Sequence, residues 1–173
     1  KEGLKEAVDF WSKVAISVIE CSSLEEAEMI KLISNTYRDT SFAFSNYVAL
    51  MCSQFSINAH RLIQRANEGY SRNSIPLPSP GVGGYCLTKD PFLLESSSSL
   101  NLPKLPSIAR EINDLAMDYP VRALESWALR HNLIYANLKV LVIGLAFKGN
   151  PPTSDIRSSP SLHFINYLIS KKI

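Results

Sequence analysis

Glycine is scarce in this chain of 173 residues, which contains only seven. Gly3 is the only glycine before Gly69, and no Gly-x-Gly-x-x-Gly turn occurs anywhere in the sequence. That turn is the usual phosphate-binding signature of a dinucleotide-binding fold. The chain therefore lacks the sequence features of a complete dinucleotide-binding domain.

Cysteine is also rare, because Cys21, Cys52 and Cys86 are the only three in the chain. They are far apart, odd in number and form no Cys-x-x-Cys pair, which argues against a disulfide framework and against a zinc site. We therefore expect no bound metal. A reducing, cytoplasmic setting fits this cysteine usage best.

Neither sign of charge dominates, since the formal net charge at pH 7 is +2. A protein that binds nucleic acid or a membrane surface normally carries a stronger basic bias. No apolar run is long enough to span a bilayer, and no secretory signal pattern is visible. The remaining composition, 46% hydrophobic and 20% charged residues, is that of an ordinary globular protein.

Helical periodicity runs through most of the chain and predicts a mainly α fold. Residues 1–20 have the pattern of an amphipathic helix. A long helix is predicted to begin after an N-cap at Ser22 or Ser23 and to continue to about Ser56, because this stretch contains no Gly or Pro. Further helices are predicted over 57–67, from Pro91, over 107–132 in one or two pieces, and over 161–171.

The long helix carries a polar stripe. Lys31, Asn35 and Arg38 follow one another at intervals of four and three residues, so they share one side of the helix, and Phe42 and Asn46 continue that side. Exposure to solvent is the ordinary reason for such a stripe.

Apolar residues cover much of the rest of this helix. A helix that is apolar over so much of its circumference is normally buried in an interface or between domains. We therefore expect a homodimer formed through residues 24–56.

The most unusual stretch is the loop that leads to Cys86. Three glycines fall within residues 81–84 and allow the backbone to approach a ligand closely. Asp90 follows four residues after the cysteine and stands beside Lys89, a pattern that favours a nucleophile with a nearby charge partner. The ordinary alternatives are a cysteine that packs as a small apolar residue and an aspartate that caps a helix beginning at Pro91.

The C-terminal part of the chain differs from the rest in its amino-acid pattern. Residues 139–147 are an apolar run rich in β-branched side chains, which predicts a buried strand of a parallel sheet. With the helix over 161–171, this strand would form the first β-loop-α unit of a truncated Rossmann-like α/β domain.

Four segments together resemble the UDP-glucose/GDP-mannose dehydrogenase family, which contains the UDP-glucose and UDP-N-acetylmannosamine dehydrogenases. They are 27–38 (AEMIKLISNTYR), 80–91 (PGVGGYCLTKDP), 109–114 (AREIND), and 144–148 with 155–160 (GLAFK and DIRSSP). The resemblance covers nearly the whole chain in the family's order. Its most specific parts are the cysteine loop and the helix with Lys31 and Asn35.

The resemblance also implies a domain organisation. Residues 1–21 would be the tail of an N-terminal NAD-binding domain, residues 22–135 a central helical dimerisation domain, and residues 136–173 the start of a UDP-binding domain. The family's glycine turn and a glutamate of its active site belong to the N-terminal domain. We therefore expect the chain by itself to be inactive.

The family reaction oxidises the C6 hydroxyl of a UDP-sugar to a carboxylate in two steps, with two molecules of NAD⁺, and supplies polysaccharide biosynthesis. By resemblance, Cys86 would capture the intermediate aldehyde as a thiohemiacetal, which the second oxidation converts to a thioester. Lys31 and Asn35 would donate hydrogen bonds to the oxygen that becomes negative. Asp90 would handle the proton or the hydrolytic water during thioester cleavage.

Other residues correspond to substrate or cofactor contacts of the family. The substrate-binding set would be Gly81, Gly83, Gly84, Arg72 and Lys148, with Arg72 reaching the sugar site of the neighbouring subunit. Arg157 would lie near the cofactor phosphates. Ordinary explanations are a solvated Lys148 and a simple ion pair between Asp155 and Arg157. Ser158 departs from the family, which usually has an acidic residue there.

Two other functions fit parts of the sequence. A helical dimerisation or interaction module would need the long helix and no chemistry. A thiol acyl-transfer enzyme would need a histidine base near Cys86, and none of His60, His131 and His163 lies in a comparable motif. The sequence leaves open which UDP-sugar is oxidised.

Overall fold

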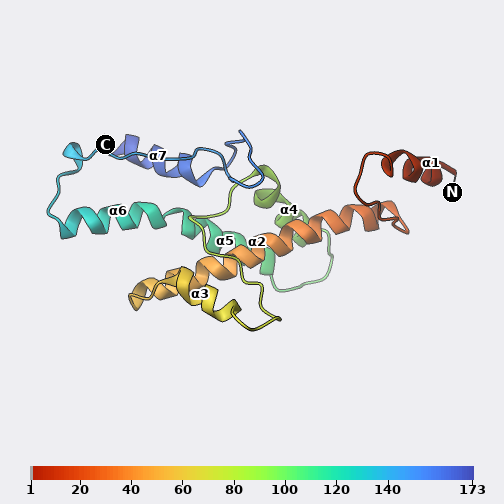
Figure 1. Ribbon diagram of the computed structural model, residues 1–173, viewed down its shortest axis with the longest axis horizontal. Coiled ribbons are helices and arrows are strands. Elements are labelled where there is room, and N and C mark those ends of the chain that lie inside the picture. The colour runs from red at the N-terminus through yellow and green to blue at the C-terminus, as the bar shows by residue number, and fades with distance from the viewer. Residues whose placement is uncertain (1) are drawn as a thin grey trace. The chain divides into compact units, whose positions relative to one another are not determined.

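The computed structural model describes residues 2–173, with Ala136 described by its backbone alone. The fold is mainly α, as predicted, and these residues form no β-strand (Figure 1). The helices are α1 (Glu2–Trp11), α2 (Leu24–Gln54), α3 (Ala59–Asn67), α4 (Tyr85–Ser96), α5 (Leu105–Met117), α6 (Tyr119–Arg130), the 3₁₀ helix η1 (Tyr135–Asn137) and α7 (Pro160–Ser170). None of them, over residues 2–173, has both the length and the apolar character needed to cross a membrane.

The chain divides into two compact units, residues 1–31 and residues 32–173. In the first unit, α1 ends at Trp11, well before the predicted end at residue 20. The following stretch contains Val14, Ile16, Val18 and Ile19, whose β-branched side chains lose rotamer freedom in a helix. The predicted cap of the long helix is confirmed, because the Ser23 hydroxyl accepts a hydrogen bond from the Glu26 backbone N–H at 3.1 Å.

The second unit contains α2 from Leu32 onward, the helices that follow it and nearly all the buried side chains. Helix α3 begins after Asn58, whose side chain accepts a hydrogen bond from the backbone N–H of Arg61. The predicted helical region 107–132 forms two helices, and Pro120 lies in the first turn of α6. Helix α5 packs against α4, α6 and α7, and α6 packs against α7 (Figure 1).

The predicted strand over 139–147 is absent. In the described residues this segment has no ladder partner, and the side chains of Leu141 and Ile143 are 83% and 86% exposed. A strand is stable only when neighbouring strands satisfy its backbone groups. The helix predicted after it is confirmed as α7.

Helix α4 begins earlier than the sequence indicated. It starts at Tyr85 after Gly84, so Pro91 lies inside the helix and Asp90 is not its N-cap. The prediction of a capping aspartate is therefore wrong. The Asp90 carboxylate does not cap the start of α4, so it is available for contacts with other parts of the fold.

Candidate active site

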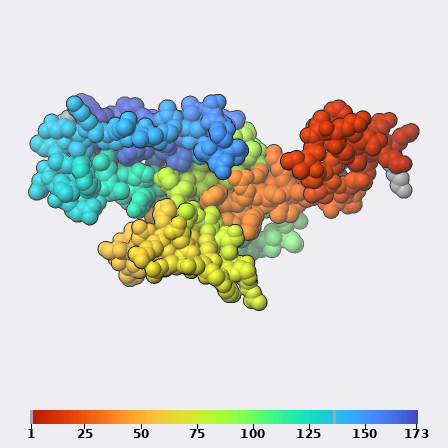
Figure 2. Space-filling view, viewed as in Figure 1, coloured from red at the N-terminus to blue at the C-terminus, as the bar shows by residue number. Residues whose placement is uncertain are grey.

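The cysteine loop is held in a conformation that needs its glycines. Gly81 and Gly84 have φ angles of +87° and +92°, a region that other residues rarely adopt. The Gly84 N–H donates to the backbone oxygen of Arg157 at 3.1 Å. A Cβ atom on Gly84 would lie 2.7 Å from the ring of Phe147. The loop is therefore in direct contact with the C-terminal segment, as the blue and green residues of Figure 2 show.

Cys86 is the second residue of α4 and its side chain is exposed. It follows directly on the turn that Gly84 makes against Arg157. The first turn of a helix carries a partial positive charge, which favours a negatively charged group there. The loop thus presents a reachable thiol at a helix start.

Asn35 and Asp90 meet in the structure, although they are 55 residues apart. The Asn35 side-chain N–H donates to Asp90 Oδ2 at 2.6 Å. Asp90 is fully buried, and its Oδ1 lies 2.6 Å from Lys89 Nζ. The hydrogen bond to Asp90, with the attraction of its charge, raises the pKa of Lys89, so Lys89 is protonated at neutral pH. The sequence placed Asn35 and Asp90 in one site, and the structure brings them into direct contact.

A cavity of about 780 Å³ joins the helix stripe to the cysteine loop. This volume lies in the range of small-molecule binding sites. The wall from α2 consists of Asn35, Arg38 and Phe42, so these three residues of the predicted stripe do face one site. The rest of the wall comes from two other segments of the second unit: Ser79, Pro80, Gly81, Val82, Gly83, Cys86 and Leu87 on one side, and Ile143–Asn150, Pro152, Thr153, Pro160 and Ser161 on the other.

The other predicted site residues are distributed as follows. Lys148 lines the cavity, and its Nζ lies 5.5 Å from the centre of the Phe147 ring. Arg72 is exposed in the connection between α3 and α4 and is not one of the described lining residues. Lys31 belongs to the first compact unit, outside the residues that form this cavity.

Arg157 lies beside the cysteine turn. Its guanidinium is 5.1 Å from the centre of the Tyr85 ring, and Lys89 Nζ is 5.3 Å from the same ring. Arg157 Nε and Nη2 also donate to the Asp155 carboxylate, Nη2 at 2.6 Å. These hydrogen bonds hold the pKa of Asp155 at about 2. Two cations therefore flank the residue that precedes Cys86.

A buried polar network that the sequence did not predict ties the loop to α2 and α5. It consists of Asp39 and Asn46 from α2 and Arg110 and Asn113 from α5, all of which are buried. Two signals pointed to it: Asn46 continued the polar stripe, and Arg110 and Asn113 belong to the segment 109–114. Neither signal says which side chains meet, because the pairs are separated by 67 to 74 residues.

The histidines do not belong to the cavity. His163 pairs with Asp118 at 2.8 Å on the surface of the second unit. Among the described residues, no group of three or more His, Cys, Asp or Glu side chains could hold a metal ion.

Comparison with known proteins decides the family. The model of the central domain of the UDP-glucose/GDP-mannose dehydrogenase family matches residues 25–115. The chain belongs to the UDP-glucose/GDP-mannose dehydrogenase family. This confirms the resemblance inferred from the four sequence segments.

Relatives in this family are named dehydrogenases of UDP-sugars. The UDP-N-acetyl-D-mannosamine dehydrogenase of Pyrococcus horikoshii is 38% identical over 142 residues, which make up 82% of this chain and 33% of that protein. The enzyme of the same name from Methanococcus vannielii is 35% identical over all 173 residues, or 39% of its length. The chain thus spans well under half the length of these family members.

A solved structure of UDP-D-ManNAc dehydrogenase from Pyrococcus horikoshii has the same fold. It superposes with a TM-score of 0.85 at 33% identity and covers 99% of this chain, which corresponds to 40% of that protein. The agreement extends over the matched central domain, which contains the cysteine loop, and over the C-terminal segment.

Proposed function

We propose that this chain supplies the thiol part of the active site of an NAD-dependent UDP-sugar 6-dehydrogenase. The observation that carries the proposal is the cavity that both Cys86 and Asn35 line, with the Asn35 side chain hydrogen-bonded to the buried Asp90. A thiol, an amide donor and a carboxylate are the groups needed to capture an aldehyde, stabilise its oxygen and hydrolyse a thioester.

Cys86 has the central role in this proposal. Its thiolate adds to C6 of the aldehyde and forms a thiohemiacetal, whose oxygen takes up a proton. Loss of a hydride and of that proton from the thiohemiacetal leaves a thioester. Water then cleaves the C–S bond, which releases the carboxylate and returns the thiol.

Asn35 and Asp90 act on two different oxygen atoms: the oxygen of the aldehyde and that of the attacking water. The Asn35 amide has two N–H donors, one of which is bonded to Asp90, so the other can bind the oxygen that becomes negative during addition. Lys31 is proposed to share this role. Asp90 accepts the proton of the water that attacks the thioester.

NAD⁺, when bound, would supply the acceptor for the hydride in each oxidation. The residue of this chain that suits its phosphates is Arg157, because its side chain is 65% exposed and its described hydrogen bonds use Nε and Nη2. Nη1 therefore remains for a phosphate oxygen, a common partner of arginine. Because the chain has no glycine-rich dinucleotide turn, we predict that it reduces no NAD⁺ when expressed alone.

UDP-N-acetyl-D-mannosamine is our first candidate for the substrate, since the relatives from Pyrococcus horikoshii and Methanococcus vannielii are named as dehydrogenases of this sugar nucleotide. The cavity wall offers Lys148 and the backbone of Gly81 and Gly83 to the sugar nucleotide. Arg72 is proposed to reach the sugar of a second subunit. The reactive thiol of Cys86 requires a reducing environment, so we place the protein in the cytoplasm.

The test uses the full-length polypeptide that carries this chain. We expect it to reduce two NAD⁺ per sugar with UDP-N-acetylmannosamine, UDP-N-acetylglucosamine or UDP-glucose, and to form the uronic acid, measured by absorbance and by mass spectrometry. If none of these sugars yields an acid, the proposed function is wrong. The alternative is then a helical dimerisation module, for which Cys86 would be alkylated no faster than free cysteine.

We also propose a homodimer formed through α2. Tyr37, Phe44 and Met51 recur every seven residues along one face and are 70%, 53% and 45% exposed. The exposed residues Ile33, Tyr47 and Phe55 widen this apolar face. A face of this kind is normally covered by a partner.

Replacing Phe44 by glutamate is expected to convert the dimer to monomer, because a charge would be buried in the interface. Sedimentation velocity measures the change. Leu129→Glu is the matched control, since Leu129 is 79% exposed on α6 and lies outside the α2 face. A wild-type protein that sediments as a monomer at high concentration would refute the proposed dimer.

A further inference from the structure

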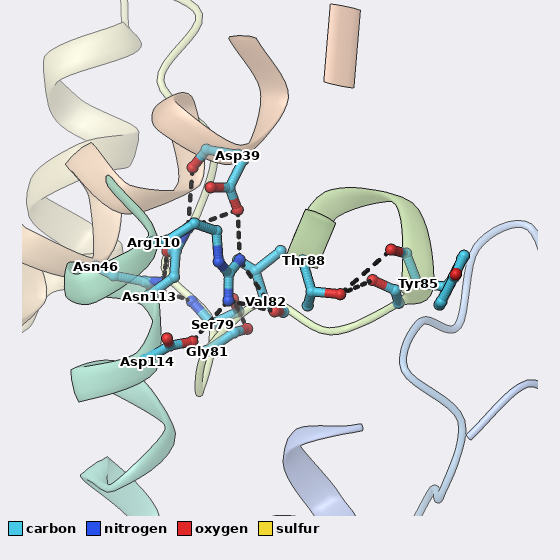
Figure 3. Close-up of polar contacts among 11 residues, drawn as sticks. Asp39, Asn46, Ser79, Gly81, Val82, Tyr85, Thr88, Arg110, Asn113 and Asp114 are labelled. Carbon is cyan, nitrogen blue, oxygen red and sulfur yellow. Dashed lines mark hydrogen bonds and ion pairs between the residues drawn. The ribbon is translucent and has the colours of Figure 1, made fainter. Parts of the chain in front are cut away.

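Arg110 is buried in the second unit and joins three parts of the fold. It lies on α5 with 3% of its surface exposed. Its Nη1 donates to Asp39 of α2 at 2.6 Å, and its Nη2 donates to Asp114 at 2.6 Å (Figure 3). Both nitrogens also lie 3.4 Å from the backbone oxygen of Val82, which belongs to the cysteine loop.

The amide side chains of the network tie the same loop to the same helices. Asn46 of α2 accepts a hydrogen bond from the Ser79 backbone N–H at 2.9 Å and donates to Asn113 at 2.9 Å. Asn113 of α5 donates to the backbone oxygen of Asp39 at 3.0 Å and to its carboxylate at 2.9 Å. Figure 3 shows these side chains converging on the loop from both helices. The start of the loop is therefore fixed to α2 and α5.

We propose that Arg110 is a positioning residue for the reaction at Cys86, which it serves by fixing the cysteine loop against the face of α2 that carries Asn35. The inference rests on the proposed function. Asp39 follows Asn35 by one helical turn, so both project from neighbouring positions on α2. A shift of the loop relative to Asp39 is therefore a shift of Cys86 relative to Asn35.

The charges of the network explain why a guanidinium is required. Burial raises the pKa of Asp39, while the positive charge of Arg110 and the hydrogen bonds from Arg110 and Asn113 oppose that rise. Among the described residues, Asp39 Oδ2 has no hydrogen-bond partner, so the carboxylate depends on the bonds to its other oxygen. Arginine can contact the carboxylates and the Val82 oxygen at once because its donors form a planar fork. A lysine can neutralise Asp39 but cannot make all these contacts.

The test compares Arg110→Lys and Arg110→Met with the wild type in the full-length polypeptide. We expect Arg110→Lys to retain most of the thermal stability. Its kcat should fall at least about tenfold, because misplacement of reacting groups by a fraction of an ångström slows the reaction. The KM for the sugar should change less than about threefold. Arg110→Met is expected to lose both kcat and stability. Ile63→Ala is the control, since Ile63 is a buried core residue of α3 outside the network. We expect this variant to lose stability and to retain kcat.

A second measurement needs no sugar and separates this inference from the proposed function. The rate of Cys86 alkylation by iodoacetamide, followed by peptide mass spectrometry, is expected to change at least about threefold in Arg110→Lys and less than about twofold in Ile63→Ala. If the wild type oxidises no UDP-sugar, the proposed function fails and this rate still tests the positioning of the loop. If the wild type is active and Arg110→Lys leaves kcat unchanged, the inference is overturned. If the wild type is inactive, an unchanged alkylation rate in Arg110→Lys overturns it. Neither result depends on whether Arg110→Met folds.

Discussion

Replacing Cys86 by serine is expected to reduce formation of the sugar acid at least about a thousandfold in the full-length polypeptide, because it removes a covalent nucleophile. A serine hydroxyl at the start of α4 has no described base beside it and forms no thioester. The oxidation of the alcohol to the aldehyde does not need the thiol, so a small amount of aldehyde with one NADH per sugar is expected. Chromatography of the sugar products and NADH absorbance measure the two steps separately.

Cys52→Ser is the matched control for this variant. Cys52 is a thiol that is only 4% exposed within α2 and does not line the cavity among the described residues. We expect it to keep the wild-type ratio of NADH to acid. Equal rates of acid release from the wild type and Cys86→Ser would exclude the covalent mechanism.

Replacing Gly83 by alanine is expected to have the second largest effect. A Cβ atom at Gly83 would lie 2.1 Å from the backbone oxygen of Ser158 and 3.0 Å from its backbone carbon. Backbone atoms cannot rotate away as a side chain can, so the loop and the C-terminal segment must separate. We expect a loss of about 1–3 kcal/mol in the free energy of unfolding, which is typical of overpacking. We also expect kcat to decrease at least about tenfold, because the reacting groups are displaced.

Gly149→Ala provides the control for the glycine variant. A Cβ atom at Gly149 would meet nothing within 4 Å, although Gly149 also lines the cavity wall. Urea denaturation and initial rates are the measurements for both variants. Wild-type stability and turnover in Gly83→Ala would show that the contact with Ser158 is dispensable.

The sequence predicted the parts of this fold that local chemistry determines. Helix α2 follows from a long stretch without Gly or Pro, whereas the helical pattern over 107–132 fitted one helix or two. The helical period alone placed Asn35, Arg38 and Phe42 on one side, and all three line the cavity. The glycines before Cys86 indicated a tight approach of the backbone, which the contacts with Ser158 and Phe147 explain.

Tertiary contacts account for what the sequence did not predict. An aspartate before a proline is a common helix cap, and only the fold shows that α4 starts at Tyr85 and that Asp90 turns towards Asn35. The apolar run at 139–147 has strand composition but lacks a neighbouring strand in the described residues. Arg110 and Asp39 meet across 71 positions of sequence, a separation at which periodicity carries no information.

The contact between Gly84 and Arg157 makes the thiol turn and the segment that follows Phe147 parts of one thermodynamic unit. A ligand that immobilises residues 144–161 also immobilises the turn, and by linkage the geometry of the turn alters the affinity for that ligand to the same degree. Part of the ordering that a ligand in front of Cys86 would require is therefore expected to be present already in the folded chain.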